Sequence, residues 1–383
     1  MTDRPVHCLY VRGVRVLIAP DKFAGTLPAP EVAAAVAGGW RAVAPGDELV
    51  ERPLADGGPG FVAVLSRALG GRLVGVRTLD PLGRPVAGEV LLVANTAYVE
   101  SAQACGLHLL SEQERNPRIT TSYGLGLLLA GAVEAGATEV VVGLGGSAVN
   151  DCGAGMLAAL GAAPVDVAGY ALPYGGAALG VAAGLTGLPQ LRQVSLVAAT
   201  DVDNPLLGLH GASNVYGPQK GATREDVLLL DAALEHFSGV LEKAFDRPGL
   251  AALPGAGAAG GIGAALLALG GRVVSGIGLV TGLIALEREL DRADLVITGE
   301  GSFDHQSLRG KVVAGVANAA RDRGLPCVVV AGRIETGHRE AANAGVSEMY
   351  SLVEHFGSVD LALAEPARGL REIATALAGQ WSR

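Results

Sequence analysis

The sequence predicts an α/β protein of two domains, and three observations support that prediction. Short apolar runs typical of buried parallel strands alternate with Ala-rich helical segments toward both ends of the chain, which is the pattern of a doubly wound sheet. Between residues 74 and 102 the pattern changes to short strands separated by turns. At 383 residues the chain is also too long for one ordinary core. We therefore expect a discontinuous outer domain around a long inserted domain.

The N-terminal part begins with a buried strand over Val14–Ala19, after a polar extension of 13 residues. An Ala-rich helix over Pro28–Val43 follows, and the Pro and Gly after Ala44 end it. The chain then predicts a strand over Leu49–Pro53 and a helix over Phe61–Leu69. Turns at Asp80–Gly83 and Val93–Thr96 separate the short strands of the next segment.

The remaining elements follow from apolar periodicity and helix-end residues. In the middle they are the helix Ser122–Glu134, the strand Glu139–Leu144, the helix Met156–Gly161, a loop-rich stretch over Asp166–Leu188, the strand Val194–Ala199, the helix Arg224–Phe245 and the helix Ile262–Leu269. Toward the C-terminus they are the helix Thr281–Leu290, the strand Asp294–Thr298, the helix Lys311–Arg323, the strand Cys327–Ala331, the helix His338–Ala344, the strand Met349–Leu352 and the helix Leu361–Ala378.

Composition excludes several classes of function. The net charge of −9, with scattered Lys and Arg, disfavours nucleic acid or an anionic membrane as partner. The most apolar stretch, Ala264–Leu286, carries Arg272 near its middle, so we do not expect a transmembrane span. The four cysteines lack metal-type spacing, and the polar N-terminus does not read as a signal peptide. We expect reduced thiols and a cytoplasmic protein.

The segment Val142–Gly155, VGLGGSAVNDCGAG, carries the strongest functional signal. An apolar strand that breaks into glycines before a helix leaves backbone N–H groups free to bind an anion such as phosphate or carboxylate. Asn150 and Asp151 add oxygen ligands and a proton acceptor. The alternative is a tight strand–helix turn in which Asn and Asp only cap the helix.

Similar polar clusters recur along the chain, most of them directly after an apolar run, at the positions where ligands bind in open α/β sheets. They are Asp21–Thr26, Ala55–Gly60, Thr200–Pro205, Gly217–Gly221 and Thr298–Asp304. Asp201 and Asp203 are separated by one residue, which suits two ligands of one Mg²⁺ or an acid–metal pair. The less favoured alternative is turn chemistry before Pro205. Lys22, Lys220 and Lys311 lie in or beside glycine loops and suit phosphate neutralisation.

Other motifs are weaker. Gly255–Gly260 matches G-x-G-x-x-G, but neither a convincing strand before it nor an acidic residue about 20 positions later supports dinucleotide binding. The seven histidines include no H-x-x-x-H pair, which makes a zinc site improbable. A nicotinamide-dependent hydroxy-acid oxidoreductase remains an alternative on the strength of the glycine motif alone.

Taken together, these motifs resemble those of bacterial glycerate kinases of the first, 2-phosphoglycerate-forming type. The resemblance covers nearly the whole chain beyond residue 13. It rests on IAPDKFAGTL (Ile18–Leu27), PLADGGPG (Pro53–Gly60), RNPRITTSYGLG (Arg115–Gly126), VGLGGSAVNDCGAGMLAALG (Val142–Gly161), ATDVDNPLLG (Ala199–Gly208), GASNVYGPQKGAT (Gly211–Thr223), GAGAAGGIGAAL (Gly255–Leu266) and LVITGEGSFDHQSLRGKVVAGVA (Leu295–Ala317). The departures are small, and one of them is Cys152 where the family usually has Gly.

The resemblance implies a flavodoxin-like parallel-sheet domain from residues 1–70 and 288–383, a larger mixed α/β domain over residues 71–287, and a site in the cleft between them. It implies phosphorylation of D-glycerate at the 2-hydroxyl by ATP with Mg²⁺, giving 2-phospho-D-glycerate and ADP. The expected partners are D-glycerate and ATP, with no nucleic acid and no membrane, in a monomer or homodimer. A non-catalytic ligand sensor on the same fold is a further alternative, which the intact set of acidic residues disfavours.

The resemblance also suggests roles for the polar clusters. Asp201 would be the general base or an Mg²⁺ ligand, with Asp203 and Asp151 next in line and Lys22 as a further catalytic group. An anion cradle would be formed by Gly145, Gly146, Ser147 and Asn150. The outer domain would contribute Asp21, Lys22, Asp56 and Gly57, opposite Glu300, Asp304 and Lys311, and a phosphate or the glycerate carboxylate would meet Gln219 and Lys220.

Overall fold

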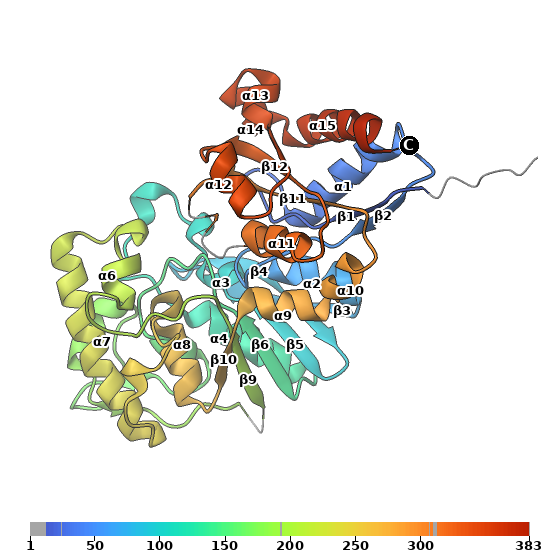
Figure 1. The fold of residues 1–383 in the computed structure, drawn as a ribbon. Coiled ribbons are helices and arrows are strands. Elements are labelled where there is room, and N and C mark those ends of the chain that lie inside the picture. The colour runs from blue at the N-terminus through green and yellow to red at the C-terminus, as the bar shows by residue number, and fades with distance from the viewer. Residues whose placement is uncertain (1–12, 24, 192–193, 306, 309–311, 383) are drawn as a thin grey trace, which may run out of the picture. The chain divides into compact units, whose positions relative to one another are not determined.

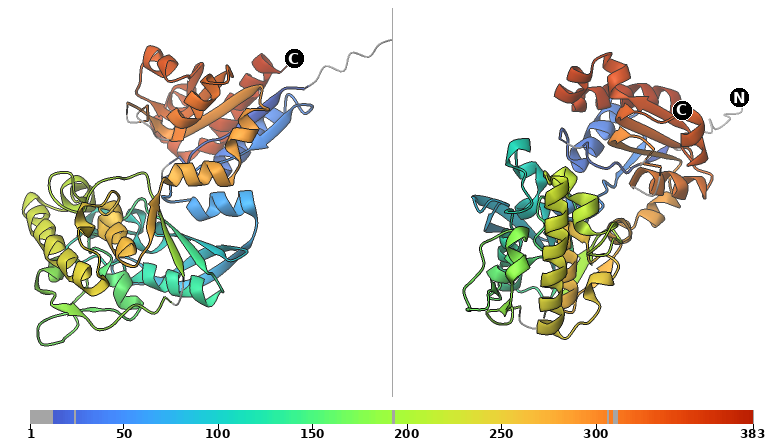
Figure 2. Two further views of the ribbon diagram at one scale, coloured as in Figure 1. Left: turned by 60° about the horizontal axis from the view of Figure 1, so that its bottom comes forward. Right: turned by 90° about the vertical axis from the view of Figure 1, so that its left-hand side faces the viewer.

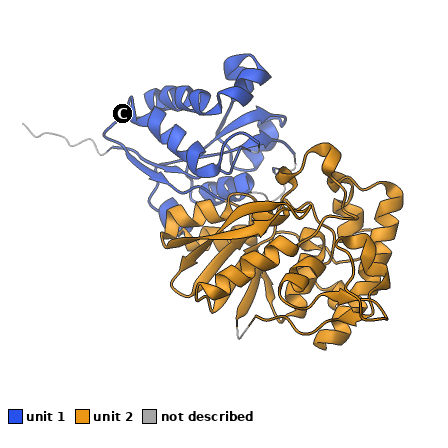
Figure 3. Ribbon diagram, turned by 180° about the vertical axis from the view of Figure 1, so that it is seen from behind, with its two compact units in different colours: residues 1–54, 285–383 blue, residues 55–284 orange. Residues whose placement is uncertain are grey.

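The protein divides into two compact units, which Figure 3 colours separately. The structure is a computed structural model that describes residues 13–382 except 24, 192–193, 306 and 309–311. Unit 1 comprises residues 1–54 and 285–383, and unit 2 comprises residues 55–284. The first predicted boundary lay at residue 70, whereas residues 55–70 group with unit 2, where α2 (Phe61–Leu69) packs on β4 and β5.

Unit 1 contains a five-stranded sheet in the order β2-β1-β11-β12-β13, and every neighbouring pair is parallel. Numbered within the unit this order is 2-1-3-4-5, the flavodoxin-like arrangement, in which the strand order reverses between β1 and β11. The strands are β1 (Arg15–Ile18), β2 (Glu48–Glu51), β11 (Leu295–Phe303), β12 (Cys327–Ile334) and β13 (Glu348–Ser351).

In unit 1, the first helix, α1, packs against the last helix, α15. Buried side chains of α1 and α15 share one hydrophobic core with β1, β11 and β12, so the two chain ends complete a single layer (Figure 1). The helices are α1 (Ala29–Arg41), α10 (Leu286–Leu290), α11 (Val312–Arg321), α12 (His338–Asn343), α13 (Leu352–Phe356), α14 (Val359–Ala364) and α15 (Pro366–Trp381).

Unit 2 contains a six-stranded mixed sheet in the order β10-β9-β6-β5-β4-β3 (Figure 2). The pairs from β10 to β5 are parallel, and β4 pairs antiparallel with both β5 and β3. The parallel strands therefore end at one common edge. The strands are β3 (Arg72–Leu79), β4 (Pro85–Val93), β5 (Thr96–Glu100), β6 (Glu139–Gly143), β9 (Ser195–Ala199) and β10 (Arg272–Val274). A separate two-stranded antiparallel sheet consists of β7 (Pro164–Val165) and β8 (Gly184–Leu185).

The helices of unit 2 share one large hydrophobic core with this sheet. The α-helices are α2 (Phe61–Leu69), α3 (Ala102–Cys105), α4 (Tyr123–Glu134), α5 (Ala154–Ala159), α6 (Ala212–Tyr216), α7 (Arg224–Phe245), α8 (Ala258–Ala268) and α9 (Gly276–Leu283). The 3₁₀ turns are η1 (Leu107–Leu109), η2 (Glu112–Glu114), η3 (Gly176–Val181), η4 (Pro218–Lys220) and η5 (Leu250–Ala252).

Two predicted helices are each divided into two helices in the structure. The segment Thr281–Leu290 is split between α9 and α10, because Ala285 between them has a left-handed backbone with φ of 53°. The segment Leu361–Ala378 is split between α14 and α15, where Pro366 starts a new helix and cannot continue the preceding one. Within the described residues, no helix is long and apolar enough to cross a membrane.

Candidate functional site

In unit 2, the loop after Leu54 lies on the ends of β6 and β9. A Cβ atom added to Gly57 would lie 2.7 Å from the carbonyl oxygen of Ala199, and one added to Gly143 would lie 2.5 Å from the carbonyl oxygen of Gly57. Only glycine permits backbones to approach this closely. The predicted cluster around Asp56 is therefore brought to the same sheet edge as the clusters that follow β6 and β9.

In the glycine-rich loop after β6, Gly145 and Gly146 are glycines for different structural reasons. A Cβ on Gly145 would lie 2.6 Å from the Cα atom of Gly58, so this residue is explained by the contact between the two loops. Gly146 is exposed and has φ of 65°, a left-handed conformation that disfavours other residues. Ser147 is buried and bridges to Gly106. Gly146 is thus the member of the predicted anion cradle that solvent reaches most directly.

Asp201 lies just beyond the end of β9 and has an exposed side chain. Its Oδ1 atom accepts a hydrogen bond of 2.6 Å from the Ser275 hydroxyl, and its Oδ2 atom accepts one of 3.0 Å from the backbone N–H of Ile277. Ser275 in turn accepts from the N–H of Gly278 and caps α9. The carboxylate is therefore held in a fixed orientation while remaining open to solvent.

Asp56 is also exposed at this edge, and its Oδ1 atom accepts a hydrogen bond of 3.0 Å from the N–H of Gly58. A Cβ on Gly276 would lie 2.3 Å from the carbonyl oxygen of Asp56 and 3.4 Å from Oδ2 of Asp201. Gly276 therefore lies between the backbone of Asp56 and the carboxylate of Asp201 and leaves no room for a larger residue.

Asp203 and Gln219 are exposed, and Asp203 has different neighbours from Asp201. The charge of Asp203, together with partial burial as the larger cause, raises the pKa of Tyr216 on α6. The side chain of Asp201 instead contacts the start of α9. The contacts given for the two side chains therefore differ, and their pairing as Mg²⁺ ligands stays a prediction.

Asp151 is completely buried. Its carboxylate accepts hydrogen bonds from the N–H and the hydroxyl of Ser122 at 2.8 and 2.9 Å, and from the N–H groups of Gly153 and Gly155 at 3.2 and 3.1 Å. Burial raises the pKa of Asp151, and these four hydrogen bonds oppose the rise. The carboxylate joins the starts of α4 and α5, which is a structural role, and its predicted catalytic role stays a prediction.

Lys220 is also buried, with 1% of its surface exposed, although its position in a glycine loop predicted phosphate contact. Its Nζ atom donates a hydrogen bond of 2.7 Å to the carbonyl oxygen of Val149, behind the glycine-rich loop. Burial lowers the pKa of Lys220 to about 8, and the charge of Asp151 partly offsets this. Lys220 therefore supports the loop from inside the unit, and its predicted contact with a phosphate stays a prediction.

Asn150 and Arg115 each have a buried polar atom without a hydrogen-bond partner among the described residues, namely Oδ1 of Asn150 and Nε of Arg115. Asn150 belongs to the predicted anion cradle, whereas Arg115 has no predicted role. The signal that could have found Arg115 is its position at the start of RNPRITTSYGLG, one of the motifs that carry the family resemblance.

Unit 1 places its predicted residues at the reversal of strand order, where ligands bind in this arrangement. The N–H of Asp21, after β1, donates to the carbonyl oxygen of Gly299 in β11 at 2.8 Å. Lys22 pairs with Asp21 at 3.6 Å, and Asp304 accepts from the N–H of Ser307 at 3.0 Å. Glu300 belongs to β11 itself, which runs further than predicted. Lys311 lies outside the described residues.

The oxygen atoms at the sheet edge of unit 2 suit a Mg²⁺ ion that is held partly by water and substrate, and they do not suit a metal ion held by protein side chains alone. Among the residues that the structure describes, no group of three or more His, Cys, Asp and Glu side chains could hold a metal ion. Mg²⁺ usually keeps several waters and takes one or two carboxylates together with substrate phosphates. Asp201, with exposed hard oxygen atoms, fits that requirement.

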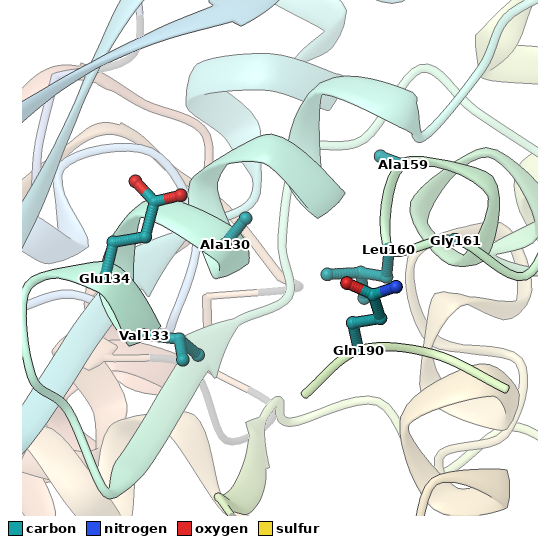
Figure 4. Close-up of a pocket in the computed structure, with 7 residues that line it drawn as sticks. All are labelled: Ala130, Val133, Glu134, Ala159, Leu160, Gly161 and Gln190. Carbon is teal, nitrogen blue, oxygen red and sulfur yellow. The ribbon is translucent and has the colours of Figure 1, made fainter. Parts of the chain in front are cut away.

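Two other features do not belong to the site. A hollow of about 640 Å³ lies at the C-terminal ends of α4 and α5, with Glu134 as its one charged lining residue (Figure 4).

The glycines of the G-x-G-x-x-G motif are explained by packing, because Cβ atoms on Gly257 and Gly260 would lie 2.3 and 2.0 Å from the carbonyl oxygens of Pro205 and Val149. The residues before this motif form η5 instead of a strand.

Comparison with known proteins gives a consistent result. The profile described as the Glycerate kinase family matches residues 16–382. The glycerate 2-kinase of Escherichia coli K12 is 40% identical over 375 residues, covering 95% of this chain and 98% of that protein. A glycerate kinase of Halalkalibacterium halodurans is 39% identical over 376 residues, covering 96% and 99%. A crystal structure from Salmonella typhimurium LT2, provisionally named glycerate kinase 2, has a TM-score of 0.79 at 38% identity and covers 96% of this chain and 98% of that one. The chain belongs to the glycerate kinase family.

Proposed function

We propose that this protein transfers the γ-phosphate of ATP to the 2-hydroxyl of D-glycerate, with Mg²⁺, giving 2-phospho-D-glycerate and ADP. Family membership supports the substrate, and one structural observation supports the chemistry. Asp201 is an exposed carboxylate whose two oxygens are oriented by Ser275 and by the N–H of Ile277. Because the donor is ATP, we place the reaction in the cytoplasm.

Phosphoryl transfer depends mainly on positioning and on neutralisation of charge. Asp201 would accept the proton of the attacking hydroxyl or hold Mg²⁺. When bound, Mg²⁺ would neutralise charge on the phosphate oxygens. In unit 1, Lys22 beside Asp21 would supply a positive charge to a phosphate, at the reversal of strand order. Within unit 2, the exposed turn at Gly146 would supply backbone N–H groups.

A coupled assay tests this proposal. Purified protein with MgATP and D-glycerate should release ADP, and the product should be the 2-phosphate, as identified by NMR. Omitting Mg²⁺ should abolish turnover. Formation of 3-phosphoglycerate would refute the assigned position, and no ADP release with D-glycerate would refute the proposed reaction.

Replacing Asp201 with Asn tests its role. General-base removal typically lowers the rate by about 10²–10⁴, and we expect Asp201→Asn to lower kcat in that range with little change in melting temperature. Asp203→Asn is the matched control and should retain most activity. If Asp201 holds Mg²⁺, the variant will also need more Mg²⁺ for its half-maximal rate. A rate for Asp201→Asn near that of the unmodified protein would remove Asp201 from the mechanism.

A further inference from the structure

Two polar atoms beside the glycine-rich loop, Nε of Arg115 and Oδ1 of Asn150, are buried without a hydrogen-bond partner among the described residues. Buried polar groups in folded proteins are almost always paired, so each such group needs an explanation. One of the two is a donor and the other an acceptor. A ligand that carries both an acceptor and a donor would satisfy them together.

One short turn, Lys220–Gly221, contacts the backbone of Arg115 and the backbone of the residue before Asn150. A Cβ on Gly221 would lie 2.2 Å from the carbonyl oxygen of Arg115, so the backbone of Arg115 is pressed against this turn. On the other side, Lys220 donates to the carbonyl oxygen of Val149, the residue before Asn150. The turn therefore fixes both residues relative to each other within unit 2.

The orientation of the Asn150 amide is also fixed. Its Nδ2 atom donates a hydrogen bond of 2.9 Å to the hydroxyl of Ser213, and the residue is fully buried. The amide oxygen is then left as the acceptor without a partner. Arg115 as a whole residue is only half-buried, whereas its Nε atom is buried.

The acidic residues near Arg115 form their hydrogen bonds and ion pairs with other groups. The adjacent Glu114 is bonded by Arg84 at 2.6 Å and by the N–H of Ser111 at 2.9 Å. Asp151, the buried acid of the loop, has its acceptors filled by backbone N–H and hydroxyl groups and is balanced by Lys220. Arg115 has no ion pair among the residues described. Its charge is therefore available to an anion.

We propose that Arg115 and Asn150 bind the hydroxy-acid substrate. Arg115 donates from Nε to a carboxylate oxygen, and Asn150 accepts at Oδ1 from the hydroxyl that is not phosphorylated. This pairing of one donor with one acceptor selects a carboxylate that carries a nearby hydroxyl. The assignment rests on the proposed function for the identity of the acid, while the site itself rests on the two unpartnered atoms.

The test compares two arginines of the same loop. Arg115→Met removes the donor and the charge, and Arg118→Met is the matched control, since Arg118 is exposed and paired with Asp226. We expect Arg115→Met to raise KM and the calorimetric Kd for D-glycerate by about 10- to 100-fold, the usual effect of losing a charge-assisted hydrogen bond. KM for ATP should stay within about twofold. Arg115→Lys should restore part of the affinity, and Arg118→Met should behave like the unmodified protein.

The acceptor is tested with D-lactate, which lacks the 3-hydroxyl. The unmodified protein should bind D-glycerate more tightly than D-lactate, and Asn150→Ala should reduce that preference, provided that its melting curve shows a folded protein. Equal KM values for D-glycerate in Arg115→Met and Arg118→Met would overturn the proposal, whatever Asn150→Ala does. If the unmodified protein does not phosphorylate D-glycerate but binds it through Arg115 in calorimetry, the proposed reaction fails and the binding site stands.

Discussion

Lys220 and Asp151 form a buried pair of opposite charges behind the glycine-rich loop. Lys220 supports the carbonyl oxygen of Val149, and Asp151 joins the starts of α4 and α5. Neither side chain needs to meet a ligand for the loop to depend on it. Their burial also makes the free energy of folding depend on pH in a direction that can be measured.

The pKa of Lys220 falls from its ordinary value of 10.5 to about 8 in the folded protein. Between these values the unfolded chain binds the proton and the folded chain does not, so raising the pH favours the folded state. We expect the free energy of unfolding of the unmodified protein, relative to Lys220→Met, to rise by up to about 3 kcal/mol from pH 8 to 10.5.

Urea unfolding at a series of pH values measures this difference. Below pH 8 the difference should be flat, because both states then carry the proton. A difference that stays constant or falls through the alkaline range would show that Lys220 keeps its proton in the folded protein.

At the residue scale, the burial of each charged residue in the polar clusters could not be predicted from the sequence. Asp201 and Asp56, which were predicted to meet a ligand, are exposed. Asp151 and Lys220 are buried instead, because partners distant in sequence, Ser122 and Val149, satisfy their polar atoms. Arg115 was given no predicted role, although it begins the motif RNPRITTSYGLG, because its unpaired Nε atom is visible only in the coordinates.

At the element scale, the glycine-rich loop after β6 contains two glycines that meet different requirements: Gly145 permits a close backbone contact, and Gly146 adopts a left-handed backbone. At Gly145 a methyl group would meet the backbone of Gly58 at 2.6 Å, so Gly145→Ala must displace one loop from the other. At Gly146 the nearest atoms are those of the Pro59 ring at 3.0 Å, and the main cost is the left-handed backbone. That conformational cost is about 1–2 kcal/mol for a residue with a Cβ atom.

We therefore expect Gly146→Ala to remain folded, with a stability loss of about 1–2 kcal/mol, and to bind an anionic substrate more weakly. Gly145→Ala should lose more stability than this. Separate calorimetric titrations of ATP and D-glycerate into folded Gly146→Ala will show which anion the turn holds. If both affinities equal those of the unmodified protein, the loop is a turn and the anion cradle is refuted.

Strands were easier to predict than helix limits, and the reason is local. Buried parallel strands such as β6 and β9 are continuous apolar runs, which the sequence shows directly. The break between α9 and α10 occurs at Ala285, an alanine with a left-handed backbone that no sequence rule marks. The break before α15 occurs at Pro366, which the sequence does mark, although apolar periodicity continues across it.

At the scale of the whole molecule, the alternation of strands and helices at both chain ends predicted a discontinuous outer domain. The 2-1-3-4-5 strand order of unit 1 agrees with the flavodoxin-like arrangement that the family resemblance implied. The point where the chain leaves unit 1 was not evident, because α2 has the same amphipathic pattern whichever sheet it covers. Its packing on β4 and β5 is a long-range contact and assigns it to unit 2.

Unit 2 is one continuous segment with its own sheet and core, so we expect the isolated fragment 55–284 to fold. It contains Arg115, Asn150 and Asp201 but lacks Lys22 and the other proposed residues of unit 1. The fragment should therefore bind D-glycerate in calorimetry with about the affinity of the full chain, and it should not release ADP. Arg115→Met in the fragment should weaken this binding as it does in the full chain. If the fragment is folded but binds no D-glycerate, the carboxylate site lies outside unit 2. If circular dichroism shows that the fragment is unfolded, the core of unit 2 depends on unit 1.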